Sequence, residues 1–213
     1  MNKEEAPPSI VPPLDAAADR HLQETGIAAE RAWRGRLLDV RRDTVRLPDG
    51  RQATREYIVH SGAVAVVPIL DDGRLVVVRQ YRYPVGRAML EFPAGKIDPG
   101  EPPFDCAVRE LAEETGYRAR EWARAGVLHN AIAYSTERIE IWFARGLQVG
   151  NAQLDEGEFL DVQALSTAEL NALAGRGELT DAKTLVGLLW LERALGVGNG
   201  TAPWPLDWHP AHG

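Results

Sequence analysis

The stretch GKIDPGEPPFDCAVRELAEETGY, residues 95–117, decides the fold of this chain, because here the hydrophobic pattern changes from that of strands to that of a helix. Apolar side chains recur in it at helical spacing, namely Phe104, Ala107, Leu111 and Ala112. Pro102 and Pro103 suit the first turn of a helix, and Gly116 suits its end. The stretch therefore predicts a helix over residues 103–115.

Strand-like segments lie on both sides of this helix. Residues 36–47 lead through the turn Pro48-Asp49-Gly50 into residues 52–59, a pattern that predicts a hairpin. Further strands are predicted at 63–70, 75–80 and 88–92 before the helix, and at 122–129, 138–144 and 159–162 after it. Ser166 and Glu169 form a capping-box pattern, and residues 180–195 have the pattern of an amphipathic helix. This order of elements predicts an α/β fold, with helices packed on a mixed sheet.

Length, charge and cysteine content exclude several classes of protein. The chain has 213 residues, of which 45% are hydrophobic, and its formal charge of −7 disfavours a general nucleic-acid binder. The longest apolar run, residues 63–70, is much shorter than the roughly 20 residues of a membrane-spanning helix, so no membrane partner is expected. The N-terminus is acidic and lacks an apolar segment, so we expect a cytoplasmic protein. The single cysteine, Cys106, excludes an internal disulfide and a cysteine-rich zinc site.

Shifts in composition divide the chain into four segments. Residues 1–18 carry four prolines, Pro7, Pro8, Pro12 and Pro13, and no clear period, so we expect a flexible leader. Residues 19–60 contain the predicted hairpin, and residues 61–195 contain the main domain. Residues 196–213 are rich in glycine and proline, and we expect a flexible tail outside the core, with Trp204 and Trp208 exposed.

Three carboxylates lie on one side of the predicted helix, because Glu110, Glu113 and Glu114 follow helical spacing. Their mutual repulsion costs stability unless a positive charge lies among them. Oxygen-only ligands suit a hard cation such as Mg²⁺ or Mn²⁺ better than zinc. The alternative is a solvated acidic face, and the residues around the helix decide between the two interpretations.

The spacing of charged and glycine residues resembles the signature of the Nudix hydrolase family. The positions that match are Gly95, Glu101, Arg109, Glu110, Glu113, Glu114 and Gly116. The resemblance implies a Nudix-type α/β/α sandwich with a mixed β-sheet, extended here by the N-terminal β-hairpin. It also implies a strand–loop–helix unit that binds divalent metal and hydrolyses a nucleoside diphosphate linked to another group.

The resemblance assigns roles to the residues of this unit. Glu110 and Glu114 would bind the metal together with the carbonyl of Ala94. Glu113 would be a third ligand or would orient the others, and we count Glu113 and Arg109 among the catalytic residues. Two or more Mg²⁺ ions would bridge the pyrophosphate oxygens and acidify a bound water.

Three residues of the unit are interpreted as structural. Glu101 can pair with Arg109 and hold the loop against the helix. Gly95, like Gly100, favours a sharp turn of the loop, and Gly116 ends the helix.

A base is needed to orient or deprotonate the attacking water. Glu137 resembles the loop glutamate that serves this purpose in ADP-ribose-cleaving members, and the alternative is an exposed acid at a strand end. His60 is interpreted as a packed or surface histidine. The acidic cluster at residues 155–158 is most simply a solvated turn, although it could border the active site.

The segments before residues 95–117, which we call the box, resemble the branch that cleaves ADP-ribose and nucleoside diphosphate sugars. These segments are residues 55–60, 79–82 and 90–95. Arg82 would contact a substrate phosphate, because a planar guanidinium suits that task. The positions similar to those that hold the nucleobase are Arg55, Glu56, Arg36 and Leu37. In this branch the N-terminal hairpin commonly crosses to a partner subunit, so the resemblance implies a homodimer.

These observations lead to three hypotheses about function. The first is Mg²⁺- or Mn²⁺-dependent hydrolysis of ADP-ribose to AMP and ribose 5-phosphate, with related nucleoside diphosphate sugars also accepted. The second is a hydrolase that prefers GDP-mannose, because ADP-ribose-cleaving members often carry a proline beyond the box and this chain has none from Tyr117 to Ala202. The third is a non-catalytic module that senses a nucleotide.

Overall fold

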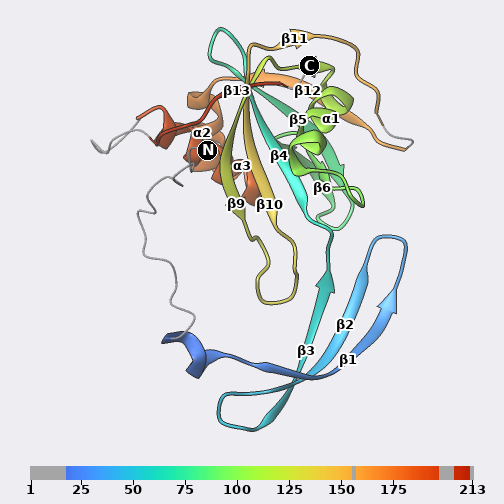
Figure 1. Ribbon diagram of the computed structural model, residues 1–213. Coiled ribbons are helices and arrows are strands. Elements are labelled where there is room, and N and C mark those ends of the chain that lie inside the picture. Colours follow the sequence, from blue (N-terminus) through green and yellow to red (C-terminus); the bar gives the residue numbers. More distant parts are fainter. Residues whose placement is uncertain (1–17, 155–156, 197–203, 212–213) are drawn as a thin grey trace. The chain divides into compact units, whose positions relative to one another are not determined.

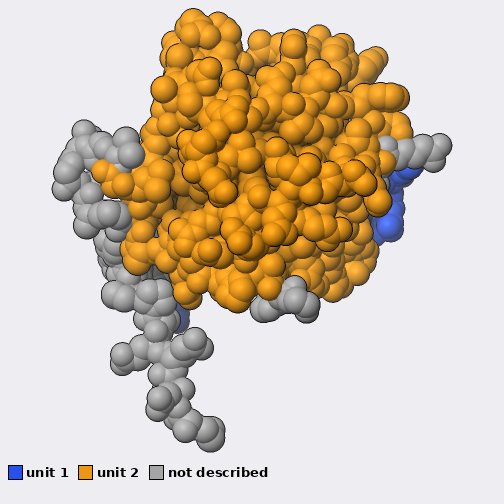
Figure 2. Space-filling view, turned by 90° about the horizontal axis from the view of Figure 1, so that it is seen from above, with its two compact units in different colours: residues 1–59 blue, residues 60–213 orange. Residues whose placement is uncertain are grey.

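The computed structural model describes residues 18–154, 157–196 and 204–211 (Figure 1). The chain divides into two compact units, residues 1–59 and residues 60–213, which Figure 2 colours separately. The predicted flexible leader, residues 1–18, lies outside the described residues except for Ala18.

The first unit is a three-stranded antiparallel sheet. A short 3₁₀ helix, η1 (Ala18–Leu22), precedes β1 (Thr25–Arg34), β2 (Asp39–Arg46) and β3 (Gln52–Val59), which pair in the order β1-β2-β3. The predicted hairpin corresponds to β2 and β3, but β1 was not predicted. Its ten residues are all exposed, so the strand lacks the alternation of apolar and polar residues that marks a half-buried strand.

The second unit is built on a mixed sheet, as predicted. Its main strands are β4 (Ala63–Ile69), β5 (Leu75–Arg82), β9 (Glu121–Leu128), β10 (Ile139–Arg145), β12 (Leu160–Leu165) and β13 (His209–Pro210), in the order β12-β5-β4-β10-β9-β13. β4 and β10 are parallel, and the other pairs are antiparallel. β6 (Arg87–Glu91) pairs with β5 and β7 (Ala94–Lys96) with β4, whereas β8 (Tyr117–Arg118) and β11 (Gln148–Val149) form a separate ribbon.

Helices cover both faces of this sheet, which confirms the predicted three layers (Figure 1). β4 is buried on both faces, so its side chains alternate between two hydrophobic clusters. Val64 and Val66 pack with α1 (Pro103–Thr115), whereas Ala65 and Val67 pack with α2 (Thr167–Gly175) and α3 (Ala182–Ala194). The core therefore fixes α1 on one face of the sheet and the other two helices on the opposite face.

Helix α1 begins and ends where its sequence predicts. Pro103 is its first residue, where the missing backbone N–H removes no helical hydrogen bond. Gly116 ends it in a left-handed conformation with φ of 74°, and its N–H donates to the Ala112 carbonyl at 3.0 Å. A side chain at Gly116 would approach the Ala152 backbone nitrogen to 2.8 Å, so both conformation and space require glycine there.

The other two helices have side-chain caps. The predicted capping box of α2 is present, with Ser166 and Glu169 each bonding the other's backbone N–H. Asp181 caps α3 by accepting from the Thr184 N–H at 3.0 Å, and the Thr184 hydroxyl accepts from the Phe92 N–H at 2.8 Å. This bond attaches the start of α3 to Phe92, which follows β6 and leads into residues 95–117.

The C-terminal segment departs from the expectation of a tail outside the core. β13 pairs with β9, and Leu206 and Trp208 pack against the core cluster on the α3 side. The Arg145 guanidinium lies 4.0 Å from the centre of the Trp208 ring. The sequence did not predict this packing, because glycines and prolines interrupt any periodic pattern of apolar residues in this segment. Among the described residues, no helix has the length and apolar character needed to cross a membrane.

Candidate active site

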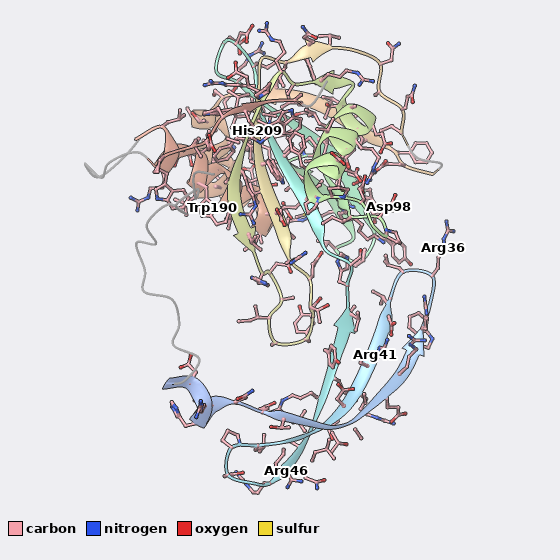
Figure 3. All side chains as sticks on the ribbon, viewed as in Figure 1. Arg36, Arg41, Arg46, Asp98, Trp190 and His209 are labelled. Atoms are coloured by element: carbon pink, nitrogen blue, oxygen red, sulfur yellow. The ribbon has the colours of Figure 1, made fainter. Side chains whose placement is uncertain are left out.

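A cleft of 590 Å³ lies between α1 and the segment that joins β7 to it. We call it the carboxylate cleft, because Glu110, Glu113, Glu114 and Glu158 line it. Arg109, Ser61 and residues 94–99 complete the lining, and Asp98 of this segment is labelled in Figure 3. The structure thus brings the carboxylates predicted on α1 into one concave site.

Arg109 ties together the carboxylates at one side of the cleft. Its guanidinium makes a bidentate pair with Glu101, at 2.8 and 2.9 Å, as the sequence predicted. The same group donates to Glu110 at 2.8 Å and to Glu113 at 2.9 Å. A single cation therefore fixes both the loop before α1 and two of the predicted metal ligands.

Three glutamates in and beside this network, Glu101, Glu110 and Glu114, have shifted pKa values. Arg109 donates to Glu101 and lowers its pKa to about 2. Burial raises the pKa of Glu110 to about 7 despite the charge of Arg109. Burial and then the charges of Glu110 and Glu158 raise the pKa of Glu114 to about 8. Burial and mutual repulsion thus disfavour the ionised forms of Glu110 and Glu114, and a cation in the cleft would favour them.

Two residues of β7 shape the floor of the cleft. The Ala94 N–H donates to Glu114 Oε2 at 3.2 Å, so the residue whose carbonyl is the predicted backbone ligand lies beside a predicted carboxylate ligand. A Cβ atom at Gly95 would lie 1.8 Å from Glu110 Oε1. The sharp turn expected at Gly95 is wrong, because the residue lies in β7 and is needed to leave room for the Glu110 carboxylate.

The donor set fits a hard divalent cation. Among the described residues no three His, Cys, Asp or Glu side chains converge closely enough to bind an ion as they stand, and Arg109 spans Glu110 and Glu113 instead. The cleft nevertheless offers several carboxylates in a space large enough for ions and water. Glu114 is buried and Glu110 is partly buried, both have raised pKa values, and a cation would offset the charge repulsion that contributes to those shifts.

A second pocket of 310 Å³ adjoins the cleft, sharing the lining residues 94–96. Arg82, predicted to contact phosphate, lines it and makes two hydrogen bonds of 2.7 Å to Glu91. Lys183 also lines it, pairing with Glu91 and, at 3.1 Å, with Asp181. Burial alone would raise the pKa of Glu91, but its bonds to Arg82 and Lys183 outweigh burial and lower it.

Sequence reasoning assigned no role to Glu91 or Lys183. A signal for Lys183 exists, because a lysine in the first turn of a helix opposes the helix dipole and needs another reason to be there. Glu91 ends a strand and is 3% exposed, and only the fold reveals its partners, which come from β5 and α3.

Glu137, the predicted base, lines this adjoining pocket rather than the carboxylate cleft. Its Oε1 lies 3.7 Å from Nε2 of His60, which lines the same pocket. The Gly62 N–H donates to His60 Nδ1 at 3.0 Å, so the neutral ring carries its proton on Nε2, facing Glu137. His60 was interpreted as a packed or surface residue, and its place beside Glu137 could not be read from a strand-like pattern.

Glu158 belongs to the acidic cluster that the sequence suggested as a solvated turn. The structure places it in the carboxylate cleft, where it accepts a hydrogen bond from Gln80 Nε2 at 3.0 Å. Asp155 and Glu156 of the same cluster lie outside the described residues. Glu158, the described acidic residue of this cluster, therefore borders the candidate site.

The residues expected at the nucleobase lie in the first unit. Arg36 and Leu37 are exposed in the loop between β1 and β2, where Figure 3 labels Arg36. Arg55 and Glu56 are exposed on β3, and Arg55 forms an ion pair with Glu24. All four residues thus belong to the first unit, and the carboxylate cleft belongs to the second.

Comparisons with known proteins cover both units. The family model described as NUDIX domain matches residues 59–186, and the nucleoside diphosphate sugar hydrolase N-terminal domain matches residues 28–58. An ADP-ribose pyrophosphatase of Bacillus subtilis is 35% identical over 175 residues, which are 81% of this chain and 95% of that protein. An ADP-ribose pyrophosphatase of Mycobacterium tuberculosis is 37% identical over 185 residues, 85% of this chain and 88% of that protein. A crystal structure of an ADP compounds hydrolase superposes with a TM-score of 0.75 and 27% identity, covering 84% of this chain and 97% of that one.

Proposed function

Because this chain belongs to the Nudix hydrolase family, we propose that it hydrolyses the pyrophosphate bond of ADP-ribose to AMP and ribose 5-phosphate. The observation that carries the proposal is the carboxylate cleft, which adjoins a pocket lined by the cations Arg82 and Lys183. Anionic oxygens of a diphosphate need positive charge, and the cleft itself is acidic. A divalent cation between the two would reconcile the acidic cleft with an anionic substrate.

Nudix hydrolases generally depend on divalent metal, and we propose Mg²⁺ here, with Mn²⁺ as a substitute. Glu110, Glu113 and Glu114 would hold the metal with the carbonyl of Ala94, and these are oxygen donors that both ions prefer. When bound, the metal neutralises phosphate charge and makes a water more acidic. Arg109 keeps Glu110 and Glu113 aligned, and Gly95 leaves the space that Glu110 occupies.

The water that attacks phosphorus must lose a proton, and Glu137 is the base proposed from the sequence. Glu158 is a second candidate, favoured by its position in the carboxylate cleft. Glu137→Gln and Glu158→Gln separate the two, because removal of a general base lowers kcat by a factor of about 10² to 10⁴. The residue whose amide retains near-normal kcat is not the base.

Arg82 would bind a phosphate of the substrate. Glu91 holds its guanidinium by two hydrogen bonds, so the fork is oriented before substrate arrives. Arg36, Leu37, Arg55 and Glu56 would contact the nucleobase. We further propose that residues 19–60 mediate a homodimer, which light scattering of the full chain and of variants of exposed Leu37 would test.

The substrate is tested by a panel of nucleoside diphosphate sugars with Mg²⁺. We expect turnover of ADP-ribose, with AMP and ribose 5-phosphate in equal amounts, because one water cleaves one phosphoanhydride bond. Cleavage of GDP-mannose without cleavage of ADP-ribose would favour the alternative, a hydrolase of other nucleotide sugars.

A non-catalytic, nucleotide-sensing module is the remaining alternative, and Glu114→Gln tests it. For an enzyme, turnover falls by orders of magnitude while the fold survives, because a metal ligand loses its charge. Glu121→Gln is a matched control, since this carboxylate pairs with Arg145 away from the cleft. A folded wild-type protein that binds ADP-ribose and cleaves no nucleoside diphosphate would support the sensor and contradict the proposal.

A further inference from the structure

Gln80 lies near the end of β5 and joins this strand to the carboxylate cleft. Val76 and Val78 of β5 are buried, and Gln80 follows on the same face because side chains alternate along a strand. Its Nε2 donates to Glu158 Oε1 at 3.0 Å, across 78 positions of sequence. The bond thus links a central strand to the acidic segment before β12.

The orientation of the Gln80 side chain is fixed by chemistry. A carboxylate only accepts hydrogen bonds, so the amide must direct its N–H and not its oxygen toward Glu158. The Gln80 Oε1 atom is then buried, with no hydrogen-bond partner in the described part of the chain. A buried unpaired amide oxygen costs stability, so the local packing gives no reason to have glutamine at this position.

Glu158 needs such a partner because like charges surround it. The carboxylates of Glu110, Glu113 and Glu114 line the same cleft, and each repels the Glu158 carboxylate. Its neighbours along the chain are Gly157, in a left-handed conformation, and Phe159, which is 83% exposed. Neither neighbour packs the segment against the sheet.

We infer that Gln80 is a positioning residue that holds the Glu158 carboxylate in the carboxylate cleft. The inference rests on the proposed function and deepens it, since it assigns a new residue to the control of the cleft. Gln80 does not touch substrate in this scheme. It acts through Glu158 alone, and this makes the two residues a coupled pair.

The direct test is the hydrogen bond itself, read without metal or substrate. The side-chain amide of Gln80 is assigned in a ¹H–¹⁵N spectrum by its loss in Gln80→Leu. We expect its resonances to move in Glu158→Ala and to stay in place in Glu121→Gln. Unmoved resonances in Glu158→Ala would overturn the inference, whatever the enzyme does to ADP-ribose.

The second test is a kinetic cycle on ADP-ribose. With Glu158 as the base of the reaction, we expect Gln80→Leu to lower kcat about 10- to 100-fold with little change in KM, as removal of a residue that orients a base does. The double variant Gln80→Leu/Glu158→Gln should be no slower than Glu158→Gln alone. Gln163→Leu is the matched control, because Gln163 is exposed on neighbouring β12.

The stability of Gln80→Leu separates positioning from a structural role. Leucine removes the unpaired buried oxygen, so we expect a melting temperature equal to or above that of the wild type. A lower melting temperature, or a kcat loss that multiplies with that of Glu158→Gln, would overturn the inference. If the wild type cleaves no nucleoside diphosphate, the proposed function fails, and the amide spectrum still decides whether Gln80 holds Glu158.

Discussion

Replacing Glu114 by glutamine should stabilise the metal-free protein while removing its activity. Glu114 is 3% exposed, and its pKa is raised from 4.5 to about 8 by burial and by the charges of Glu110 and Glu158. Because the folded-state pKa lies above the unfolded-state value, ionisation opposes folding between pH 4.5 and 8. At pH 7 this penalty spans about 2.5 pH units at about 1.4 kcal/mol each, or about 3 kcal/mol. Glutamine is neutral and avoids it.

The assay is urea unfolding with EDTA at several pH values. The free energy of unfolding of Glu114→Gln should exceed that of the wild type by little near pH 4.5 and by about 3 kcal/mol at pH 7. Above pH 8 the difference should level off. Added Mg²⁺ should reduce this difference in free energy of unfolding, because only the wild type gains stability from binding the ion.

The matched control is Glu91→Gln, at a carboxylate that is also 3% exposed. There the pKa is lowered, since Arg82 and Lys183 outweigh burial, so the charge supports folding. We expect the free energy of unfolding of this variant to be about 3 kcal/mol below that of the wild type, as when one partner of a buried ion pair is removed. If Glu114→Gln unfolds at lower urea than wild type at pH 8, the view of Glu114 as an uncompensated buried charge is refuted.

Four further outcomes follow from the site. Gly95→Ala should abolish activity, checked by turnover and circular dichroism, because its Cβ would lie 1.8 Å from Glu110 Oε1; normal turnover would refute this. The free energy of unfolding of Glu101→Gln should be about 1–3 kcal/mol below that of the wild type at pH 7, because Arg109 lowers the pKa of Glu101 to about 2. Urea unfolding should show this difference vanishing as the pH falls from 4.5 to 2. EDTA should stop turnover and Mg²⁺ restore it, whereas activity that survives chelation contradicts a metal-dependent mechanism. Arg82→Lys should raise KM for ADP-ribose about tenfold, because an ammonium lacks the bidentate fork, and an unchanged KM argues against phosphate contact.

The elements with local signals were predicted well from the sequence. Helix α1 is bounded by Pro103 and Gly116 as predicted, because proline and glycine act through their own backbones. The Ser166–Glu169 capping box is equally local, and it begins α2 where expected. The mixed sheet followed from short apolar runs separated by turns. In each case the residues that decide the structure lie within a few positions of one another.

The features that depend on distant residues were not predicted. β1 is exposed along its length, so no hydrophobic period marks it. Glu91 meets Lys183 across 92 positions, and Glu158 meets Gln80 across 78, which no spacing rule anticipates. A requirement for glycine at residue 95 was predicted, but for a different reason. The Glu110 carboxylate of α1 occupies the space that a side chain at residue 95 would need.

The pairing of β13 with β9 has a consequence for handling the protein. A sheet edge with free N–H and C=O groups is a template for intermolecular aggregation, and β13 shields the edge of β9 at Glu121 and Trp122. Removing residues 204–213 would uncover that edge together with the apolar surface beneath Trp208. Fusion partners and purification tags therefore belong at the other terminus, and a shortened chain should precipitate at concentrations that the full chain tolerates.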